Sequence, residues 1–376
     1  MAGLYIHIPL CHSKCAYCDF HSFPENSGIG RYVRDRYISA LLNEFSLRRH
    51  ELTEPIQTIY IGGGTPSILT TEELRHLTDS LPLDYVSEFT IEANPEDVTP
   101  EWVQTIVDSG INRVSIGVQS LNDNELNAVM RRHSGADAIR AINLLADGGI
   151  KEISADLIYG LPGQTISSWE NSIDGLLATP ITHLSAYSLM YEPGTRLTTM
   201  LNAGKLIPVD ENDEQQMYRM LTEKTSSVGM IHYEISNFAY TGHTALHNSN
   251  YWNMTPYLGL GPGAHSFDGN SIRRYNPTDS RRYVDSLSKE CLIYEEENET
   301  PSDRLNDLII TALRTSHGLN LAIVEQMFGN DATSSLIMRA QPYIDKGMLN
   351  LTDNTILRIP ERYWLISNSI LRDILA

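Results

Sequence analysis

The chain of 376 residues has room for one large domain and a smaller one, and its hydrophobic fraction of 41% supports folded cores rather than disorder. Its formal net charge of −19 argues against nucleic-acid binding and against general binding to anionic membranes, because both favour a basic surface. No apolar run approaches the roughly 20 residues that cross a bilayer, and the opening MAGLYIHIPL has no basic start of a signal peptide, so we expect a cytoplasmic protein.

Strand-like and helix-like segments alternate through the first half of the chain. Residues 3–9 predict a buried strand, and residues 29–49 predict a helix with one apolar i, i+4 row. Five further strands are expected at 57–63, 88–94, 113–120, 152–160 and 183–190, with helical stretches between them. Six such units fit an open doubly wound sheet or an incomplete (β/α)6 barrel. The barrel is favoured because polar residues follow the strands, where barrels place their chemistry.

The regular alternation of strands and helices ends at about residue 200. Residues 211–228 predict a helix, 230–239 a further strand, and 240–265 a loop rich in Gly, His and aromatic residues. The acidic segment EEENETP (295–301) predicts a linker. We therefore expect domain boundaries at 1–230 for the partial barrel, 231–300 for an extension and linker, and 301–376 for a C-terminal domain.

The C-terminal segment predicts a small, mainly helical domain. Three helices are followed by a hairpin at 349–359 and a closing helix at 361–375, an order that resembles a winged helix. The segment is not markedly basic, so a packing domain is favoured over a nucleic-acid-binding one.

Cys11, Cys15 and Cys18 follow the first strand directly, with the spacing C-x3-C-x2-C. Three thiolates on one loop suit a [4Fe–4S] cluster with one iron open to an exogenous ligand. They also suit a zinc site whose fourth ligand is a neighbouring histidine: His7, His12 or His21. Thiols clustered without a metal would oxidise, so that interpretation is the weakest of the three.

The order of the later motifs resembles the radical S-adenosylmethionine (SAM) superfamily. GGGTPS (62–67) follows the second strand, IEANPE (91–96) the third, GVQSLND (117–123) the fourth, and ADLIYGLPGQT (155–165) contains the fifth. The resemblance implies a [4Fe–4S] cluster on the three cysteines, with SAM on its open iron. It further implies that SAM is held by Tyr5, Tyr17, Gly63, Gly64, Thr65, Glu92, Gln119, Arg131 and Asp156, with Arg131 in the helix after the fourth strand. A carboxylate there can accept hydrogen bonds from ribose hydroxyls or an ammonium group, and the arginine can pair with a carboxylate.

Across nearly its whole length the chain resembles the oxygen-independent coproporphyrinogen III dehydrogenase group. That group contains porphyrinogen decarboxylases and HemW-type haem chaperones. Phe20 stands where the dehydrogenases carry a further cysteine, only ten residues precede Cys11, and HNSNYW (247–252) matches the HN-x-x-YW signature of the haem-binding branch. The resemblance therefore implies a haem chaperone, with a coproporphyrinogen III dehydrogenase as the alternative.

Four residues are the predicted haem contacts. A neutral imidazole is a good axial ligand, so His247 is the first candidate, with His243, His265 and Cys291 as rivals. The other three are Asn248, which could bond a propionate, and Tyr251 and Trp252, whose rings can lie against a porphyrin. On residue types alone, HNSNYW favours an aromatic-anchored loop in which His247 is structural, and the family resemblance reverses that preference. The expected partners are haem, acceptor apo-haemoproteins, some of them at a membrane, and an electron donor to the cluster. The chain is expected to be a monomer or a homodimer.

Overall fold

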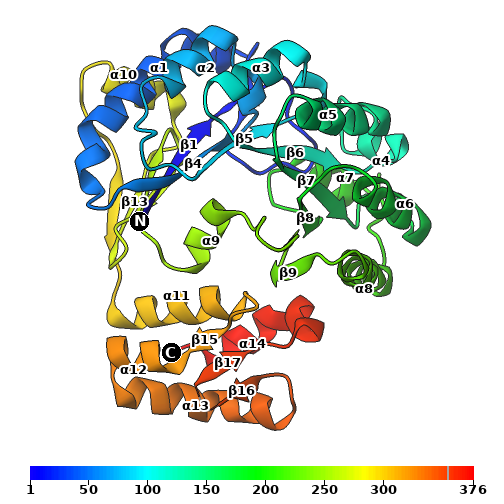
Figure 1. Ribbon diagram of the computed structural model, residues 1–376, viewed down its shortest axis with the longest axis vertical. Helices are drawn as coiled ribbons and strands as arrows, with labels where there is room; N and C mark the ends of the chain where they lie inside the picture. The colour runs from blue at the N-terminus through cyan, green and yellow to red at the C-terminus, as the bar shows by residue number, and fades with distance from the viewer. Residues whose placement is uncertain (354) are drawn as a thin grey trace.

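The computed structural model describes residues 1–353 and 355–376. Six parallel strands form the centre of one large sheet, in the order β1-β4-β5-β6-β7-β8 (Figure 1). They are β1 (Ala2–Ile8), β4 (Ile56–Gly63), β5 (Glu88–Ala93), β6 (Arg113–Gln119), β7 (Glu152–Tyr159) and β8 (His183–Ser188). The connecting helices are α1 (Gly28–Arg48), α2 (Thr71–Thr78), α3 (Pro100–Asp108), α4 (Asp123–Ala128), α5 (Gly135–Asp147) and α6 (Ile166–Leu177). Within the described chain the two ends of the sheet do not pair, which confirms the predicted incomplete (β/α)6 barrel.

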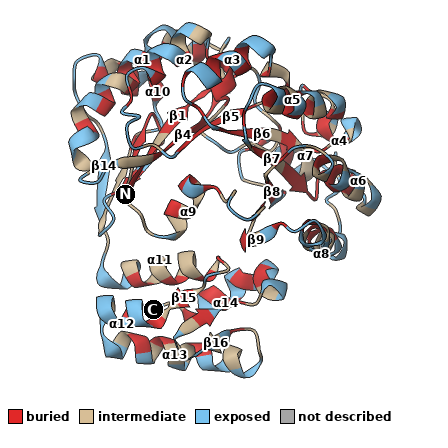
Figure 2. Cartoon of the chain, viewed as in Figure 1, coloured by how far each residue is buried: buried red, intermediate tan, exposed pale blue. Residues whose placement is uncertain are grey.

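Alternate residues of these strands divide the apolar core from the interior of the barrel. Leu4 and Ile6 of β1 and Ile59 and Ile61 of β4 are fully buried in the core cluster shared with the helices. Because successive side chains of a strand point to opposite faces, the residues between them face the interior, and these are largely polar or aromatic. Figure 2 shows the central strands buried while the outer faces of the helices are exposed. The interior of the half-barrel is therefore a place for ligands rather than a second apolar core.

Later parts of the chain extend this sheet at both edges. After α7 (Arg196–Asn202) and α8 (Glu211–Ser227), β9 (Ile231–Glu234) and β10 (Asn237–Ala239) add antiparallel strands beside β8. At the other edge, β11 (Tyr257–Leu260) pairs in parallel with β1. It is followed outward by the antiparallel strands β12 (His265–Phe267), β13 (Ile272–Tyr275) and β14 (Glu295–Asn298), with α10 (Ser280–Leu287) before β14.

Two predictions in this region were wrong. The expected loop at 240–265 contains α9 (Leu246–Trp252) and β11, so HNSNYW is helical. The expected acidic linker contains β14 at the sheet edge. Its charges are matched across the strand pair: Arg274 donates to Glu296 at 2.9 Å, and the Tyr275 hydroxyl donates to Glu297 at 2.8 Å. Such cross-strand pairs compensate for the low strand propensity of glutamate.

The C-terminal domain is mainly helical, as predicted. It consists of α11 (Pro301–Leu313), α12 (Leu321–Phe328), α13 (Asn330–Asp345) and α14 (Ser367–Ile374), with a small sheet of β15 (Leu319–Asn320), β16 (Asn350–Thr352) and β17 (Ile356–Arg358). The predicted hairpin is β16 and β17, and Asn354 within it lies outside the described residues. The closing helix begins later than predicted, because Glu361–Ile366 forms a 3₁₀ turn first.

The C-terminal domain packs below the open side of the barrel, with α11 next to α9 (Figure 1). His232 of β9 lies at this junction. Its ring stacks on Phe238 with 4.0 Å between ring centres and meets Trp364 edge-on at 4.3 Å. None of the helices in the described ranges combines the length and apolar character that a membrane span requires.

Candidate functional site

The three cysteines lie on one loop at the carboxyl end of β1. Cys11 ends β2 (Leu10–Cys11), which pairs with β3 (Phe23–Pro24) and so closes the loop that carries Cys15 and Cys18. Ala16, in the middle of the loop, donates its backbone N–H to Val129 and accepts one from Leu197. Backbone hydrogen bonds thus hold the loop at both ends and at its centre, and none of its three thiols forms a disulfide.

The donor set fits an iron–sulfur cluster better than a closed zinc site. Burial, with smaller contributions from the thiols of Cys18 and Cys15, raises the pKa of Cys11 to about 11, so the three sulfurs influence one another. The histidines considered as a fourth ligand have other partners. His7 bonds to the carbonyl of His21, His12 lies between two carboxylates, and the ring of His21 bonds to Ser280 at 2.9 Å. Within 1–353 and 355–376 no group of three or more His, Cys, Asp or Glu side chains, the three cysteines included, is arranged to hold a metal ion, so the preference rests on the chemistry of the donors. A cluster held by three thiolates would keep one iron open.

The glycine-rich turn after β4 packs tightly against the start of the chain. Gly63 has a φ of +112°, and a Cβ there would lie 2.6 Å from the His7 ring. A Cβ on Gly64 would lie 2.5 Å from the Leu10 carbonyl, and the Thr65 N–H donates to that same carbonyl at 2.8 Å. These glycines therefore seat the turn against the cysteine loop, which brings its backbone to the edge of the candidate SAM site.

Two carboxylates face the barrel interior beside this turn. Glu92 accepts hydrogen bonds from the Tyr60 hydroxyl at 2.8 Å and from the Gly63 N–H at 3.1 Å. Asp156 accepts from the Ser115 hydroxyl at 3.1 Å. Burial raises the pKa of Glu92 to about 7 and that of Asp156 to about 6. A cationic ligand such as an ammonium group would favour the ionised form of both, so the pair is suited to bind one.

Arg131 connects the carboxyl end of β6 to the cysteine loop. It donates to Cys15 Sγ at 3.4 Å, to Asn94 Oδ1 at 2.7 Å and to the Gly117 carbonyl at 2.6 Å. Its Nε is buried and has no partner among the described residues. The prediction that this arginine lies in a helix was wrong: α4 ends at Ala128, and Met130 has a φ of +63°. That break turns the guanidinium toward the cluster loop.

Two further predicted SAM residues lie at the same end of the barrel. Gln119 ends β6 with a φ of +67°, a backbone conformation that turns the chain sharply at the rim. Tyr17 is on the cysteine loop, where burial raises its pKa and Arg131 opposes that shift. The predicted SAM residues on the cysteine loop and on β4 to β7 are thus brought to one end of the half-barrel.

The predicted haem residues lie on α9, inside the open half of the barrel. His247 is only 1% exposed, and both of its ring nitrogens are engaged. Nδ1 lies 2.9 Å from the Thr58 hydroxyl, and Nε2 lies 3.0 Å from the Tyr251 hydroxyl. Burial lowers the pKa of His247 to about 3, so the ring is neutral. Asn248 and Trp252 are half-buried.

The start of α9 is fixed by a carboxylate from another part of the chain. Glu88 accepts the backbone N–H groups of Leu246 at 2.9 Å and His247 at 2.7 Å, and Arg113 lies 3.0 Å from the same carboxylate. Asn250 donates to the Thr58 hydroxyl at 3.0 Å. Sequence reasoning missed Thr58 and Glu88, although their inward positions follow from strand alternation.

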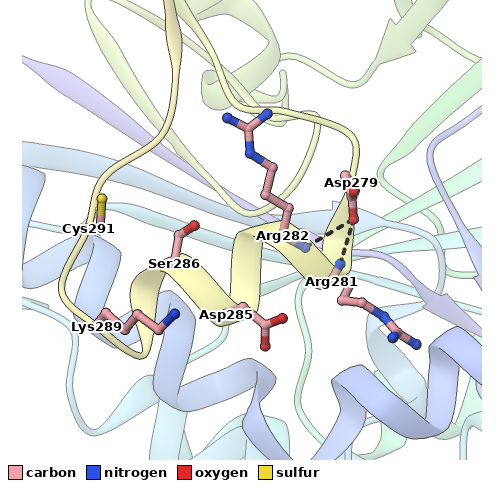
Figure 3. A pocket seen from close by; sticks show the side chains of 7 residues that line it. All are labelled: Asp279, Arg281, Arg282, Asp285, Ser286, Lys289 and Cys291. Atoms are coloured by element: carbon pink, nitrogen blue, oxygen red, sulfur yellow. Dashed lines mark hydrogen bonds between the residues drawn. The ribbon is translucent and has the colours of Figure 1, made fainter.

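The rival haem ligands lie apart from α9's interior face. His243 bonds to Glu152 at 2.9 Å, and His265 is exposed with its ring against Tyr275. Cys291 is exposed and lines a shallow surface pocket beside α10 (Figure 3). That pocket also contains Arg281 and Arg282, whose N–H groups are capped by Asp279.

The chain is similar to known proteins both in sequence and in fold. Residues 5–176 match the model of the radical SAM superfamily, and residues 300–366 match that of the HemN C-terminal domain. The chain is 32% identical over 363 residues to the haem chaperone HemW of Bacillus subtilis, covering 95% of this chain and 94% of that protein. It is also 32% identical over 361 residues to HemW of Lactococcus lactis, covering 93% of each. The solved structure of coproporphyrinogen III oxidase (HemN) from Escherichia coli shares the fold, with a TM-score of 0.83 at 20% identity over 100% of this chain and 90% of that chain.

Proposed function

The chain belongs to the HemW haem-chaperone family within the radical SAM superfamily, and we therefore propose that it binds haem and transfers it to acceptor haemoproteins. The observation that carries the proposal is that His247, the first residue of the HN-x-x-YW motif, faces the interior of the same half-barrel that carries the three cysteines. Membership in the superfamily agrees with the motif-based resemblance.

In this proposal Cys11, Cys15 and Cys18 hold a [4Fe–4S] cluster, which supplies one-electron chemistry and an open iron for SAM. The turn at Gly63–Thr65 places backbone groups beside the cofactor, while Glu92 and Asp156 accept its ammonium and hydroxyl hydrogens. Arg131 and Gln119 close the same end of the site, and Tyr5 and Tyr17 line it. These roles agree with the inward direction of both carboxylates and with the bond from the guanidinium to Cys15.

Haem binding requires a local change at α9. His247 Nε2 leaves the Tyr251 hydroxyl and binds the haem iron, while Nδ1 keeps its bond to Thr58. Metal-bound histidines usually retain a partner on the second nitrogen in this way, because it fixes the ring orientation. Asn248 is positioned for a propionate, and the rings of Tyr251 and Trp252 lie against the porphyrin. The acceptors include haemoproteins at membranes, an electron donor serves the cluster, and the chain acts as a monomer or homodimer.

The test is an anaerobic optical titration of the cluster-reconstituted protein with haem. We expect saturable binding near one haem per chain, and an altered Soret band in His247→Ala. His183→Ala is the matched control, because His183 is equally buried and bonds to a tyrosine hydroxyl at 2.8 Å within the same barrel. The haem-loaded protein should then convert an apo-haemoprotein to its haem-bound form.

Two results would contradict the proposal. If wild type does not bind haem saturably, the chaperone function fails, and conversion of coproporphyrinogen III under reducing conditions becomes the next assay. If His247→Ala binds haem with an unchanged Soret band, the iron has another ligand. In that case the variants His243→Ala, His265→Ala and Cys291→Ala test the three rival ligands.

A further inference from the structure

Aromatic rings form an unbroken column from α9 toward the cysteine loop. The His247 ring stacks on Tyr60 of β4, with 5.2 Å between ring centres and 28° between ring planes. Tyr60 stacks in turn on Tyr5 of β1 at 6.1 Å and 27°. These two tyrosines are direct neighbours in the β1–β4 register, so the strand pairing itself sets their contact.

The column continues through two histidines to the loop. His7 follows Tyr5 at 6.1 Å between ring centres with the ring planes tilted by 53°, and its Nδ1 accepts the Tyr5 hydroxyl hydrogen at 3.1 Å. His21 stacks on His7 at 6.1 Å and 29°, and its carbonyl accepts the His7 Nε2–H at 2.8 Å. The next residue, Ser22, has its hydroxyl 3.9 Å from Cys18 Sγ. The column therefore ends, at His21, on the loop that carries the three cysteines.

The fold holds the middle of the column in place. The backbone carbonyl of His7 accepts the hydroxyl of Tyr37 from α1. The absence of a side chain on Gly63 leaves the space that the His7 ring occupies. His7 is 6% exposed, so its ring is shielded from water along its length.

We propose that this column conducts one electron from the reduced cluster to ferric haem bound at α9, a step that rests on the proposed haem site. The cluster passes from [4Fe–4S]⁺ to [4Fe–4S]²⁺, and the haem iron passes from Fe(III) to Fe(II). No bond breaks and no proton is transferred. A low-potential one-electron carrier reduces the cluster again. The direction is set by the strongly negative potentials that thiolate-held clusters can reach. The protein is therefore a haem reductase as well as a haem carrier, and it delivers ferrous haem.

The test measures the transfer of one electron from the reduced cluster to ferric haem, with SAM left out of the reaction mixture. The cluster is reduced anaerobically, the reductant is removed by gel filtration, and one equivalent of ferric haem is added in a stopped-flow cell. We expect the ferrous haem spectrum to appear as the electron paramagnetic resonance signal of the reduced cluster disappears, one haem for each cluster. A sample with the three cysteines replaced by alanine should bind haem and leave it ferric.

Paired variants test the column itself. His7→Leu removes a ring from its middle, whereas His7→Phe keeps a ring and loses only the hydrogen bonds. We expect the rapid reduction phase to be lost in His7→Leu and retained in His7→Phe. Tyr60→Leu and Tyr60→Phe form a second pair in case the first pair assembles the cluster poorly. Iron content and haem affinity are measured for each variant, so that a packing defect is recognised as such.

The outcomes separate this inference from the proposed function. Ferric haem that binds and persists beside a reduced cluster overturns the electron transfer and leaves the chaperone intact. Equal reduction rates in wild type and in both leucine variants, with equal cluster content and haem affinity, overturn the column as the path. Absence of saturable haem binding overturns the haem site on which the inference rests.

Discussion

The bond between His247 Nε2 and the Tyr251 hydroxyl makes a sharp prediction about Tyr251→Phe. The bond is 3.0 Å long, and the imidazole that takes part in it is buried. In the proposed haem complex Nε2 binds iron instead, so this bond is present only in the haem-free state. Replacing tyrosine by phenylalanine removes the bond and keeps the aromatic ring. The haem-free state is then destabilised, while the haem complex loses little.

The usual cost of leaving a buried polar atom unpaired sets the size of both effects. A buried polar atom left without its partner costs about 1 to 2 kcal/mol. The free energy of unfolding of the haem-free protein should therefore fall by that amount, as measured by urea denaturation. Haem affinity should rise by the equivalent factor, roughly 5- to 30-fold. An optical titration of cluster-reconstituted protein with ferric haem measures it.

A lower free energy of unfolding together with a higher haem affinity in Tyr251→Phe distinguishes this mechanism from general damage to the site, which would lower both. Tyr257→Phe is the control, because Tyr257 packs edge-on against Tyr251 at 4.9 Å and directs its hydroxyl to Arg273. It should leave haem affinity unchanged. If Tyr251→Phe lowers stability and leaves haem affinity equal or weaker, Nε2 is not vacated on binding. The assignment of Nε2 as the iron ligand would then be refuted.

Three further predictions concern the chain without haem. Burial raises the pKa of Glu92 from 4.5 to about 7. Between these pH values the folded state keeps a proton that the unfolded state has released. The free energy of unfolding therefore falls as the pH rises from 4.5 to about 7. Urea denaturation of the cluster-free chain should show a weaker fall in Glu92→Gln, and equal slopes would refute the assignment. Gly63→Ala should lower the free energy of unfolding by more than about 1 kcal/mol because of its positive φ and the ring beside it. Gly28→Ala, in open space at the start of α1, should be neutral or stabilising in the same denaturation series. His232→Ala removes the ring between β9 and Trp364, so limited proteolysis should cut near residue 300 faster than in wild type, and an unchanged rate would show that other contacts hold the C-terminal domain.

The central sheet and the cluster loop were predictable because their signals are local. Each parallel strand is a short apolar run, and the cysteine spacing and the carboxylates at strand ends can be read directly in the sequence. The helix α9 could not be predicted in this way. Its N-cap residue, Ala245, makes no side-chain hydrogen bond, and the carboxylate that accepts its first N–H groups is Glu88, which lies 158 residues earlier than Leu246. A helix of seven residues whose cap comes from another strand carries almost no local signal.

The strand β14 and the position of Arg131 were hidden for related reasons. Glutamates are poor strand formers, and only their pairing with β13 across the sheet edge stabilises them there. The segment before Arg131 has helical composition, but a left-handed residue at Met130 ends the regular structure. In both cases tertiary contacts override local propensity, and in the second case the guanidinium comes into contact with Cys15 Sγ.

The proposed haem ligand His247 and the glycine-rich turn of the proposed SAM site lie at different depths of the same inner face, which bears on the chemistry. On β4, Thr58 contacts His247 while Gly62 begins the glycine-rich turn, and four residues of strand span roughly 13 Å. Abstraction of a hydrogen atom requires reacting atoms about 3 to 3.5 Å apart. An electron can cross a larger gap through packed rings, and between these two levels the structure places Tyr60, Tyr5 and His7. The separation therefore favours a protein that delivers an electron to bound haem over one that attacks a porphyrin side chain at that position.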